Sequence, residues 1–349
     1  MRAIFLIVLV PFLVGCFEQA APTPVEIQQY PATWTPAPTP TNTPLPPTAT
    51  LVIQRTPGTF PTRDPNARIL PNTPRSGIGV AMTLTNETPN ILAPLAARAN
   101  VIFTDGSMPI PRGAFVFLNV DAGTLGAAMP LAPQYAGVLY ENAAGSDADA
   151  LSAKRAALTP RLVLASVAVT DTATIEKLAA VTDGLRLENF LRAPEAPNAQ
   201  FKSEAEWKAD VDTLAALSSN VTGIVVTNTR LDAEDKATEV TPEQWLSYAL
   251  ASFLLGASNS HSFFGFESPL APQVLDTPLW NVQLGSPQAQ MFKQNNVYQR
   301  RFTNGLVLVN PSASTFAFAL ARNYLDVNGT RVDQVEMLPH TGMILLNVE

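Results

Sequence analysis

The chain has 349 residues, 46% of them hydrophobic and 15% charged, with 31 prolines, two histidines and one cysteine. One cysteine excludes an internal disulfide, and so few cysteines and histidines exclude a Cys/His zinc site. Residues 76–349 hold 17 basic and 26 acidic side chains, a net charge of −9 without a Lys/Arg cluster, which argues against binding to nucleic acid.

The first 16 residues have the pattern of an export signal. Arg2 precedes an apolar run over residues 3–14, too short for a membrane-spanning helix of about 20 residues. The run ends in Leu-Val-Gly-Cys, which resembles the bacterial lipobox, whose cysteine is acylated. We expect residues 1–15 to be a lipoprotein signal peptide and Cys16 to anchor an extracytoplasmic protein to the bacterial cell membrane. A plain signal peptide is the alternative.

Residues 16–75 form a segment rich in proline and threonine. Fourteen prolines and twelve threonines lie between residues 20 and 75. Proline fixes φ and lacks a backbone donor, so this composition predicts a disordered, extended spacer rather than a packed element. A proline-motif ligand for a partner is the alternative.

Short apolar runs that end in polar or acidic residues begin after Gly77. Eight such runs read as strands: Ile78–Leu84, Val101–Thr104, Phe115–Asn119, Gly137–Tyr140, Leu162–Val167, Leu185–Leu187, Gly223–Thr227 and Ser262–Phe266. Helical patterns separate several of them, at Ala148–Leu158, Thr174–Val181, Glu204–Leu217 and Pro242–Gly256. In the last of these, Thr241 reads as an N-cap, Pro242 as the first helical residue and Gly256 as the stop.

This alternation predicts an α/β fold with a parallel sheet buried on both faces. Eight strand units favour a (β/α)8 TIM-like barrel over residues 76–280 rather than an open doubly wound sheet. The stretches Asp105–Gly113 and Ala122–Tyr135 are rich in glycine and proline, so we expect a partly abbreviated barrel with reduced outer helices there.

The alternation of strand-like and helical segments ends after Trp280. Strand-like segments at Tyr298–Phe302, Leu306–Asn310, Phe316–Ala319, Gln334–Met337 and Met343–Leu346 are separated by turn sequences such as Asn304-Gly305. We expect residues 281–349 to form a small C-terminal antiparallel β appendage.

In such barrels the chemistry lies at the carboxyl ends of the strands. The residues that close the apolar runs are Asn119, Asp121, Glu141, Asn142, Glu188, Asn189, Asn228, Arg230 and Glu267. Glu141 and Glu188 stand out because each directly ends a buried run. Two carboxyl groups that face one cleft are the minimum for glycoside hydrolysis, with one as acid and the other as nucleophile or base.

The sequence also allows interpretations other than a pair of catalytic glutamates. Polar residues occur wherever a strand leaves the core, so the two glutamates can also be coincidental. Ser260-His261 lacks the elbow sequence of a serine hydrolase. Gly77-Ile78-Gly79 lacks the third glycine of a dinucleotide site. We expect no cofactor and no metal ion.

Residues 183–190 (DGLRLENF) resemble the D-G-x-x-x-E-x-F strand of the hypothetical glycosyl hydrolase-like family 15 proteins, related more distantly to endo-polygalactosaminidases. Trp245 and the following helix, the last strand around residues 263–266, and the closing stretch from Trp280 to Gly342 also resemble that family. In related barrels a catalytic Asp closes strand four and a second acid closes strand six. By position the resemblance implies Glu141, in place of that Asp, and Glu188 as the pair.

We therefore expect a surface-tethered glycoside hydrolase that acts on an extracellular or envelope polysaccharide, as a monomer. Glu188 would be the general acid and Glu141 the nucleophile or base. The expected sugar contacts are Asp121, Asn142, Asn228 and Arg230, with Tyr140 and Trp280 as stacking residues; Trp280 can equally be a core residue. The alternative function is a non-catalytic carbohydrate-binding or scaffolding lipoprotein on a degenerate barrel.

Overall fold

The computed structural model describes residues 67–74, 77–85, 92–107, 109, 112–127, 130–193, 200–220, 223–231, 241–269 and 271–348. All described residues belong to the unit Thr62–Glu349. The expected signal peptide, Cys16 and the spacer up to residue 66 lie outside the described residues. Within the described ranges, no helix is long and apolar enough to cross a membrane.

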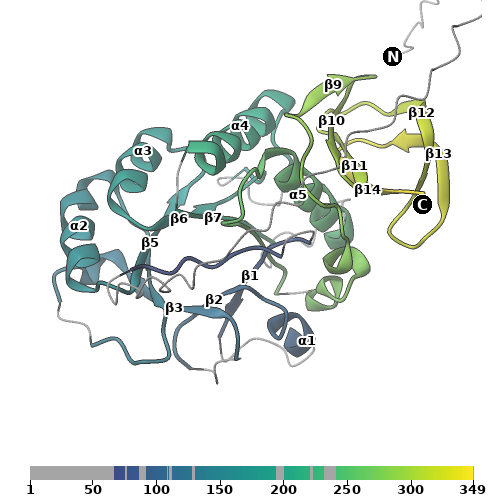
Figure 1. Ribbon diagram of the computed structural model, residues 1–349. Coiled ribbons are helices and arrows are strands. Elements are labelled where there is room, and N and C mark those ends of the chain that lie inside the picture. Colours follow the sequence, from purple (N-terminus) through teal and green to yellow (C-terminus); the bar gives the residue numbers. More distant parts are fainter. Residues whose placement is uncertain are drawn as a thin grey trace, which may run out of the picture. The chain divides into compact units, whose positions relative to one another are not determined.

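Eight parallel strands form a closed barrel in which each strand pairs with the next along the chain (Figure 1). They are β1 (Val80–Leu84), β2 (Val101–Thr104), β3 (Phe115–Asp121), β4 (Gly137–Glu141), β5 (Leu162–Ala168), β6 (Gly184–Glu188), β7 (Ile224–Arg230) and β8 (Ser262–Glu267). Pairing of Val80 with Phe264 joins β1 to β8 and closes the barrel. The predicted (β/α)8 barrel is confirmed.

Side chains of each strand alternate between two separate cores. One core fills the barrel and includes Phe103, Phe117, Leu139 and Phe263. The other lies between the strands and the outer elements. It includes Tyr140 and other strand residues that alternate along the chain with the inward-facing ones. Because successive strand residues point to opposite faces, the residue two positions after each inward apolar side chain also faces the barrel interior, nearer its mouth.

The outer helices are α1 (Ala93–Ala96), α2 (Ala148–Ala157), α3 (Thr172–Val181), α4 (Glu204–Asn220) and α5 (Pro242–Gly256). Short 3₁₀ turns add η2 (Ala122–Thr124), η3 (Gly145–Asp147), η5 (Pro272–Leu275) and η6 (Pro278–Asn281). The barrel is abbreviated in its first half: α1 has four residues, η2 takes the place of a helix after β3, and the described residues between β2 and β3 form none.

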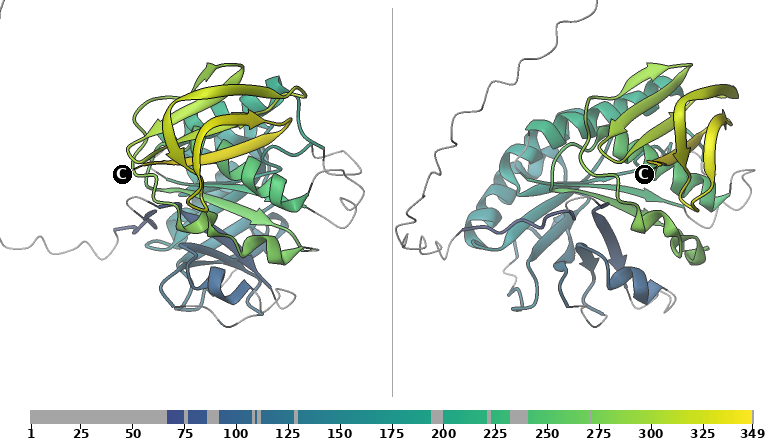
Figure 2. Two further views of the ribbon diagram at one scale, coloured as in Figure 1. Left: turned by 90° about the vertical axis from the view of Figure 1, so that its right-hand side faces the viewer. Right: turned by 45° about the vertical axis from the view of Figure 1, so that its right-hand side comes forward.

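The C-terminal part forms a six-stranded antiparallel sheet, as predicted. Its strands are β9 (Phe292–Gln294), β10 (Val297–Phe302), β11 (Gly305–Asn310), β12 (Phe316–Leu325), β13 (Arg331–Met337) and β14 (Thr341–Asn347), in the order β13-β12-β14-β11-β10-β9. The short strand β9 was not expected from the sequence. Figure 2 shows this sheet, in green to yellow, beside the barrel.

Helix α5 joins the barrel to this sheet. A Cβ atom at Gly342 of β14 would lie 2.6 Å from the carbonyl oxygen of Ser247, so only glycine permits this close approach. At the other end of α5, the buried guanidinium of Arg300 donates to the carbonyl oxygens of Leu254 and Leu255, at 3.0 and 2.9 Å. Arg300 thus satisfies acceptors that a helix C-terminus leaves open.

Residues 67–74 form a strap across the amino-terminal ends of the barrel strands, which we define as the N-terminal strap. Arg68 donates to Asp183 at 2.8 Å, and the amide of Thr73 donates to the carbonyl oxygen of Ser260 at 2.7 Å. Between them, Leu70 packs against the core inside the barrel. The expected spacer extended to residue 75, but its last described part is packed, because these side chains cover the open base of the barrel.

Candidate active site

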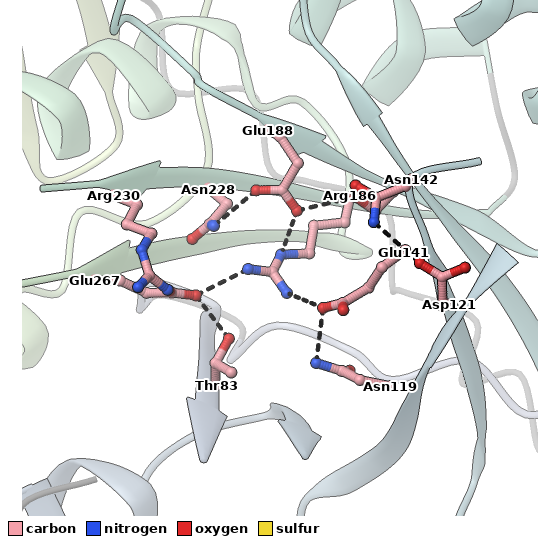
Figure 3. A network of polar contacts seen from close by, with 11 residues as sticks. Thr83, Asn119, Asp121, Glu141, Asn142, Arg186, Glu188, Asn228, Arg230 and Glu267 are labelled. Atoms are coloured by element: carbon pink, nitrogen blue, oxygen red, sulfur yellow. Dashed lines mark hydrogen bonds and ion pairs between the residues drawn. The ribbon is translucent and has the colours of Figure 1, made fainter. Parts of the chain in front are cut away.

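Three glutamates meet at the carboxyl ends of the barrel strands. Glu141 ends β4, Glu188 ends β6 and Glu267 ends β8. These strands alternate around the barrel, and the strand period of two points all three side chains into its mouth. The three carboxylates gather around the guanidinium of Arg186 (Figure 3).

Arg186 lies two residues before Glu188 on β6 and shares its inward face. Its Nε is 2.8 Å from Glu188 Oε1 and its Nη2 is 2.8 Å from Glu267 Oε1. Its Nη1 is 4.0 Å from Glu141 Oε1, so this third contact is looser. The arginine side chain is only 7% exposed, and its guanidinium carbon lies 5.1 Å from the ring centre of Phe103. Burial this deep requires the charge to be compensated, which the glutamates provide.

Each glutamate also accepts a hydrogen bond from a neighbouring strand. Asn119 Nδ2 donates to Glu141 at 3.0 Å, and Asn228 Nδ2 donates to Glu188 at 2.8 Å. The remaining donors are Ser166 to Glu188 at 3.1 Å, Thr83 to Glu267 at 2.7 Å and Arg230 to Glu267 at 3.0 Å. The carboxylates are therefore oriented by contacts on both sides rather than left free at the rim.

Asparagines follow two of the glutamates in the left-handed backbone region. Asn142 has φ 57° and Asn189 has φ 56°. Asparagine adopts this conformation more readily than most residues, and it turns the chain sharply as the strand ends. The side chain of Asn142 then donates to Asp121 Oδ2 at 3.3 Å.

The environments of Glu141 and Glu188 differ. Burial raises the pKa of Glu141, and the charges of Glu188, Glu267 and Asp121 add to this rise, whereas Arg186 opposes it. Glu188 has the short contact with Arg186 and accepts hydrogen bonds from two further donors, Ser166 and Asn228. Unequal environments of two carboxyl groups are the usual basis for separate acid and base roles.

The structure brings together most of the site residues expected from the sequence. Glu141 and Glu188 share Arg186, and the polar residues around them include Asp121, Asn142, Asn228 and Arg230. Two expected stacking residues lie elsewhere.

Tyr140 is 1% exposed and belongs to the outer core, since it precedes the inward Glu141 by one residue. Its burial raises the pKa of its hydroxyl. Trp280 lies in η6, where its ring packs 6.0 Å from that of Phe264 and its Nε1 donates to Leu275. Phe264 also belongs to the outer core, which agrees with the core interpretation of Trp280 rather than with stacking at the barrel mouth.

Sequence reasoning assigned no role to Arg186 or Glu267, although Glu267 was recognised as a strand-closing residue. A usable signal was present for Arg186: a charge inside an apolar run, at the two-residue spacing that gives it the same face as Glu188. No local signal shows that Glu267 meets Arg186, because that contact depends on how the barrel closes. Thr83, Asn119 and Ser166 were missed as donors for the same reason.

Among the described residues, no group of three or more His, Cys, Asp or Glu side chains has a geometry that could hold a metal ion. In the described part of the chain, one buried polar atom at the site lacks a hydrogen-bond partner. The buried Oδ1 of Asn119 has no hydrogen-bond partner, although its Nδ2 donates to Glu141. A hydroxyl donor at this position would satisfy it.

The three glutamates lie in a part of the chain that matches a known protein family. Residues 135–306 match the model of hypothetical glycosyl hydrolase family 15. The match confirms the resemblance found in the sequence, and the barrel is glycoside hydrolase-like. It includes Glu141, Arg186, Glu188 and Glu267, whereas Asn119 and Asp121 precede it. No curated protein sequence matches the chain.

Solved structures give more distant similarities. A GH27 β-L-arabinopyranosidase from Geobacillus stearothermophilus aligns with a TM-score of 0.45 and 9% identity, over 78% of this chain and 97% of that chain. Amy13B from Eubacterium rectale aligns with a TM-score of 0.45 and 9% identity, over 80% and 97% of the two chains. The xylanase and α-amylase inhibitor protein XAIP-II from Scadoxus multiflorus aligns with a TM-score of 0.35 and 11% identity, over 60% and 99%.

Proposed function

We propose that the protein is a surface-tethered glycoside hydrolase that cleaves an extracellular or envelope polysaccharide, with Glu141 and Glu188 as its catalytic pair. The contact of both carboxylates with one guanidinium carries this proposal. With N···O distances of 4.0 and 2.8 Å to nitrogens of the same group, the contacting oxygens lie within about 10 Å of each other, close to the upper limit of carboxyl separations in glycosidases.

The contacts support an assignment of roles opposite to the one expected from the sequence. Glu141, whose pKa is raised by burial, would be the protonated general acid. Glu188, which is oriented by Arg186 and Asn228, would be the nucleophile or the base for water. Glu141 would give its proton to the glycosidic oxygen as that oxygen leaves the anomeric carbon. Glu188 would attack that carbon or take a proton from the attacking water.

The position of the N-terminal strap is compatible with tethering. The strap contacts residues that precede β6 and β8, at the end of the barrel opposite the glutamates. A chain that enters at that end leaves the barrel mouth uncovered by the strap. We propose lipidation at Cys16 as the membrane anchor, which mass spectrometry of the membrane-extracted protein would detect as a diacylglyceryl modification lost in a Cys16→Ala variant.

The test of catalysis uses the full chain and a panel of bacterial and plant polysaccharides, with released reducing ends as the readout. Removing either carboxylate should lower the rate at least about 100-fold. The variants are Glu141→Gln and Glu188→Gln, with Glu336→Gln on the exposed face of β13 as the matched control. Equal release by wild type and both site variants would refute the assignment.

Aryl glycosides separate the two roles. A nitrophenolate leaving group needs no proton, so Glu141→Gln should retain much more activity on the nitrophenyl glycoside than on the natural linkage. Glu188→Gln should lose activity on both substrates. The reverse pattern would restore Glu188 as the acid.

One observation favours a second candidate, a non-catalytic carbohydrate-binding protein. Arg186 already lies between the glutamates, and both oxygens of Glu188 accept hydrogen bonds. This alternative predicts saturable glycan binding without release of reducing ends, unaffected by Glu141→Gln and Glu188→Gln.

A further inference from the structure

A pocket of about 360 Å³ lies beside the cluster of glutamates, at the carboxyl ends of β1, β7 and β8. It shares Thr83, Arg230 and Glu267 with that cluster. Figure 3 shows these three residues on one side of Arg186, with Glu141 and Asp121 on the other. Its volume falls within the range of about 300–1,000 Å³ typical of ligand pockets.

The walls of this pocket combine two kinds of surface. Thr83, Thr85, Arg230, Glu267 and Ser268 supply hydrogen-bonding groups. Apolar side chains that include Leu92 and Leu275 make up the remainder of the lining. A pyranose ring has the same division, with hydroxyl groups around its rim and C–H bonds on its faces, so a sugar can satisfy both walls at once.

The charges in the wall are already compensated. Glu267 Oε2 accepts from Arg230 at 3.0 Å, and Glu267 Oε1 accepts from Arg186 at 2.8 Å. A ligand carboxylate would compete with Glu267 for these guanidinium groups, and a ligand ammonium would compete with them for Glu267. A neutral ligand avoids both desolvation costs.

We propose that this pocket is a subsite that holds one neutral pyranose unit, with its rim hydroxyls at Glu267 and Arg230 and its apolar face on Leu92 and Leu275. As the place of one sugar of a cleaved polysaccharide, the subsite rests on the proposed function. The substrate chain then crosses the barrel mouth from the Asp121 side to the β8–β1 side.

A larger pocket, of about 510 Å³, lies at the opposite end of the barrel, and its described lining contains no charged side chain. It includes Thr73 of the N-terminal strap and Ser258 after α5, far along the strands from the glutamates. Its position separates it from the glutamates, so the smaller pocket is the one that can serve the same ligand.

The test measures binding, without turnover, to the full chain by saturation-transfer NMR and calorimetry. The probes are the methyl pyranosides of glucose, galactose, mannose and N-acetylglucosamine, each compared with its uronate or amino counterpart. At least one neutral pyranoside should bind about tenfold or more tightly than its charged counterpart.

Leu92→Asp should weaken that binding at least tenfold, whereas Leu320→Asp, on half-exposed β12, should leave it unchanged. Thr83→Val provides a second variant that retains volume, and should also weaken binding. Arg230→Gln leaves Glu267 with one cation fewer and should shift the preference toward the protonated amino sugar.

Glu336→Gln, on the exposed face of β13, should change binding less than twofold. If neutral pyranosides bind as described but no polysaccharide is cleaved, the catalytic proposal fails and the pocket stands as a binding site. A preference for charged sugars, an absence of pyranoside binding, or binding unaffected by Leu92→Asp and Thr83→Val would overturn the inference.

Discussion

Replacing Arg186 with methionine removes the cation that joins Glu141, Glu188 and Glu267 while preserving most of the side-chain volume against Phe103. Three carboxylates would then face one barrel mouth without their shared guanidinium. Removing one partner of a buried ion pair costs about 3–5 kcal/mol. Glu141 and Glu188 are 42% and 27% exposed, so water can solvate part of the freed charge. We therefore expect a loss near the lower limit, about 3 kcal/mol of unfolding free energy at pH 7.

The loss should depend on pH. In the wild-type protein the folded-state pKa of Glu141 is raised, so its contribution to stability is fully present below its unfolded pKa of about 4.3 and is lost as pH rises through the folded value. Arg186 lowers this pKa, and its removal raises the pKa further. The deficit of Arg186→Met relative to wild type should therefore be small near pH 4 and grow towards pH 7.

Urea unfolding of both proteins at pH 4.5, 5.5 and 7 measures this difference. Arg331→Met, at an exposed position of β13, is the matched control and should change stability by less than about 0.5 kcal/mol. A deficit at Arg186 below that value, or one that does not vary with pH, would refute the argument that this residue compensates the carboxylates.

Two further predictions concern arginines that join parts of the fold. Arg300→Met should destabilise the protein by about 3 kcal/mol or more, because carbonyl oxygens at the end of α5 lose their charged donor. Calorimetric unfolding measures the change, and a loss of unfolding free energy below about 1 kcal/mol would contradict the prediction. Burial lowers the pKa of Arg300 to about 10, a value at which it stays charged at pH 7. Arg68→Met should cost about 1–2 kcal/mol, since Asp183 keeps its contact with Arg155, and should speed hydrogen exchange at the amide of Thr73. Exchange at Thr73 equal to wild type would show that Arg68 does not hold the strap.

Local sequence determined the elements of the barrel. Each barrel strand is a short run whose successive side chains point alternately into the two cores. The apolar runs in the sequence located all eight strands to within a few residues. Thr241 and Pro242 begin α5 as expected, because the threonine hydroxyl accepts from the amide of Gln244 at 3.2 Å and proline needs no donor in the first turn. The sequence also located Glu141 and Glu188 at strand ends, because each directly follows a buried apolar run.

Tertiary structure alone decided which side chains meet. The strand order places β8 two strands from β6, and the curvature of the barrel brings Glu267 to 2.8 Å from Arg186, which lies 81 positions earlier in the chain. Closure also gives the barrel an open base, which the N-terminal strap covers with Leu70, although the composition of that region predicts a spacer. The two-residue period of a strand determines the face of the sheet on which a side chain lies. It carries no information on which residue of a distant strand stands opposite, because that depends on the register and curvature of the whole barrel.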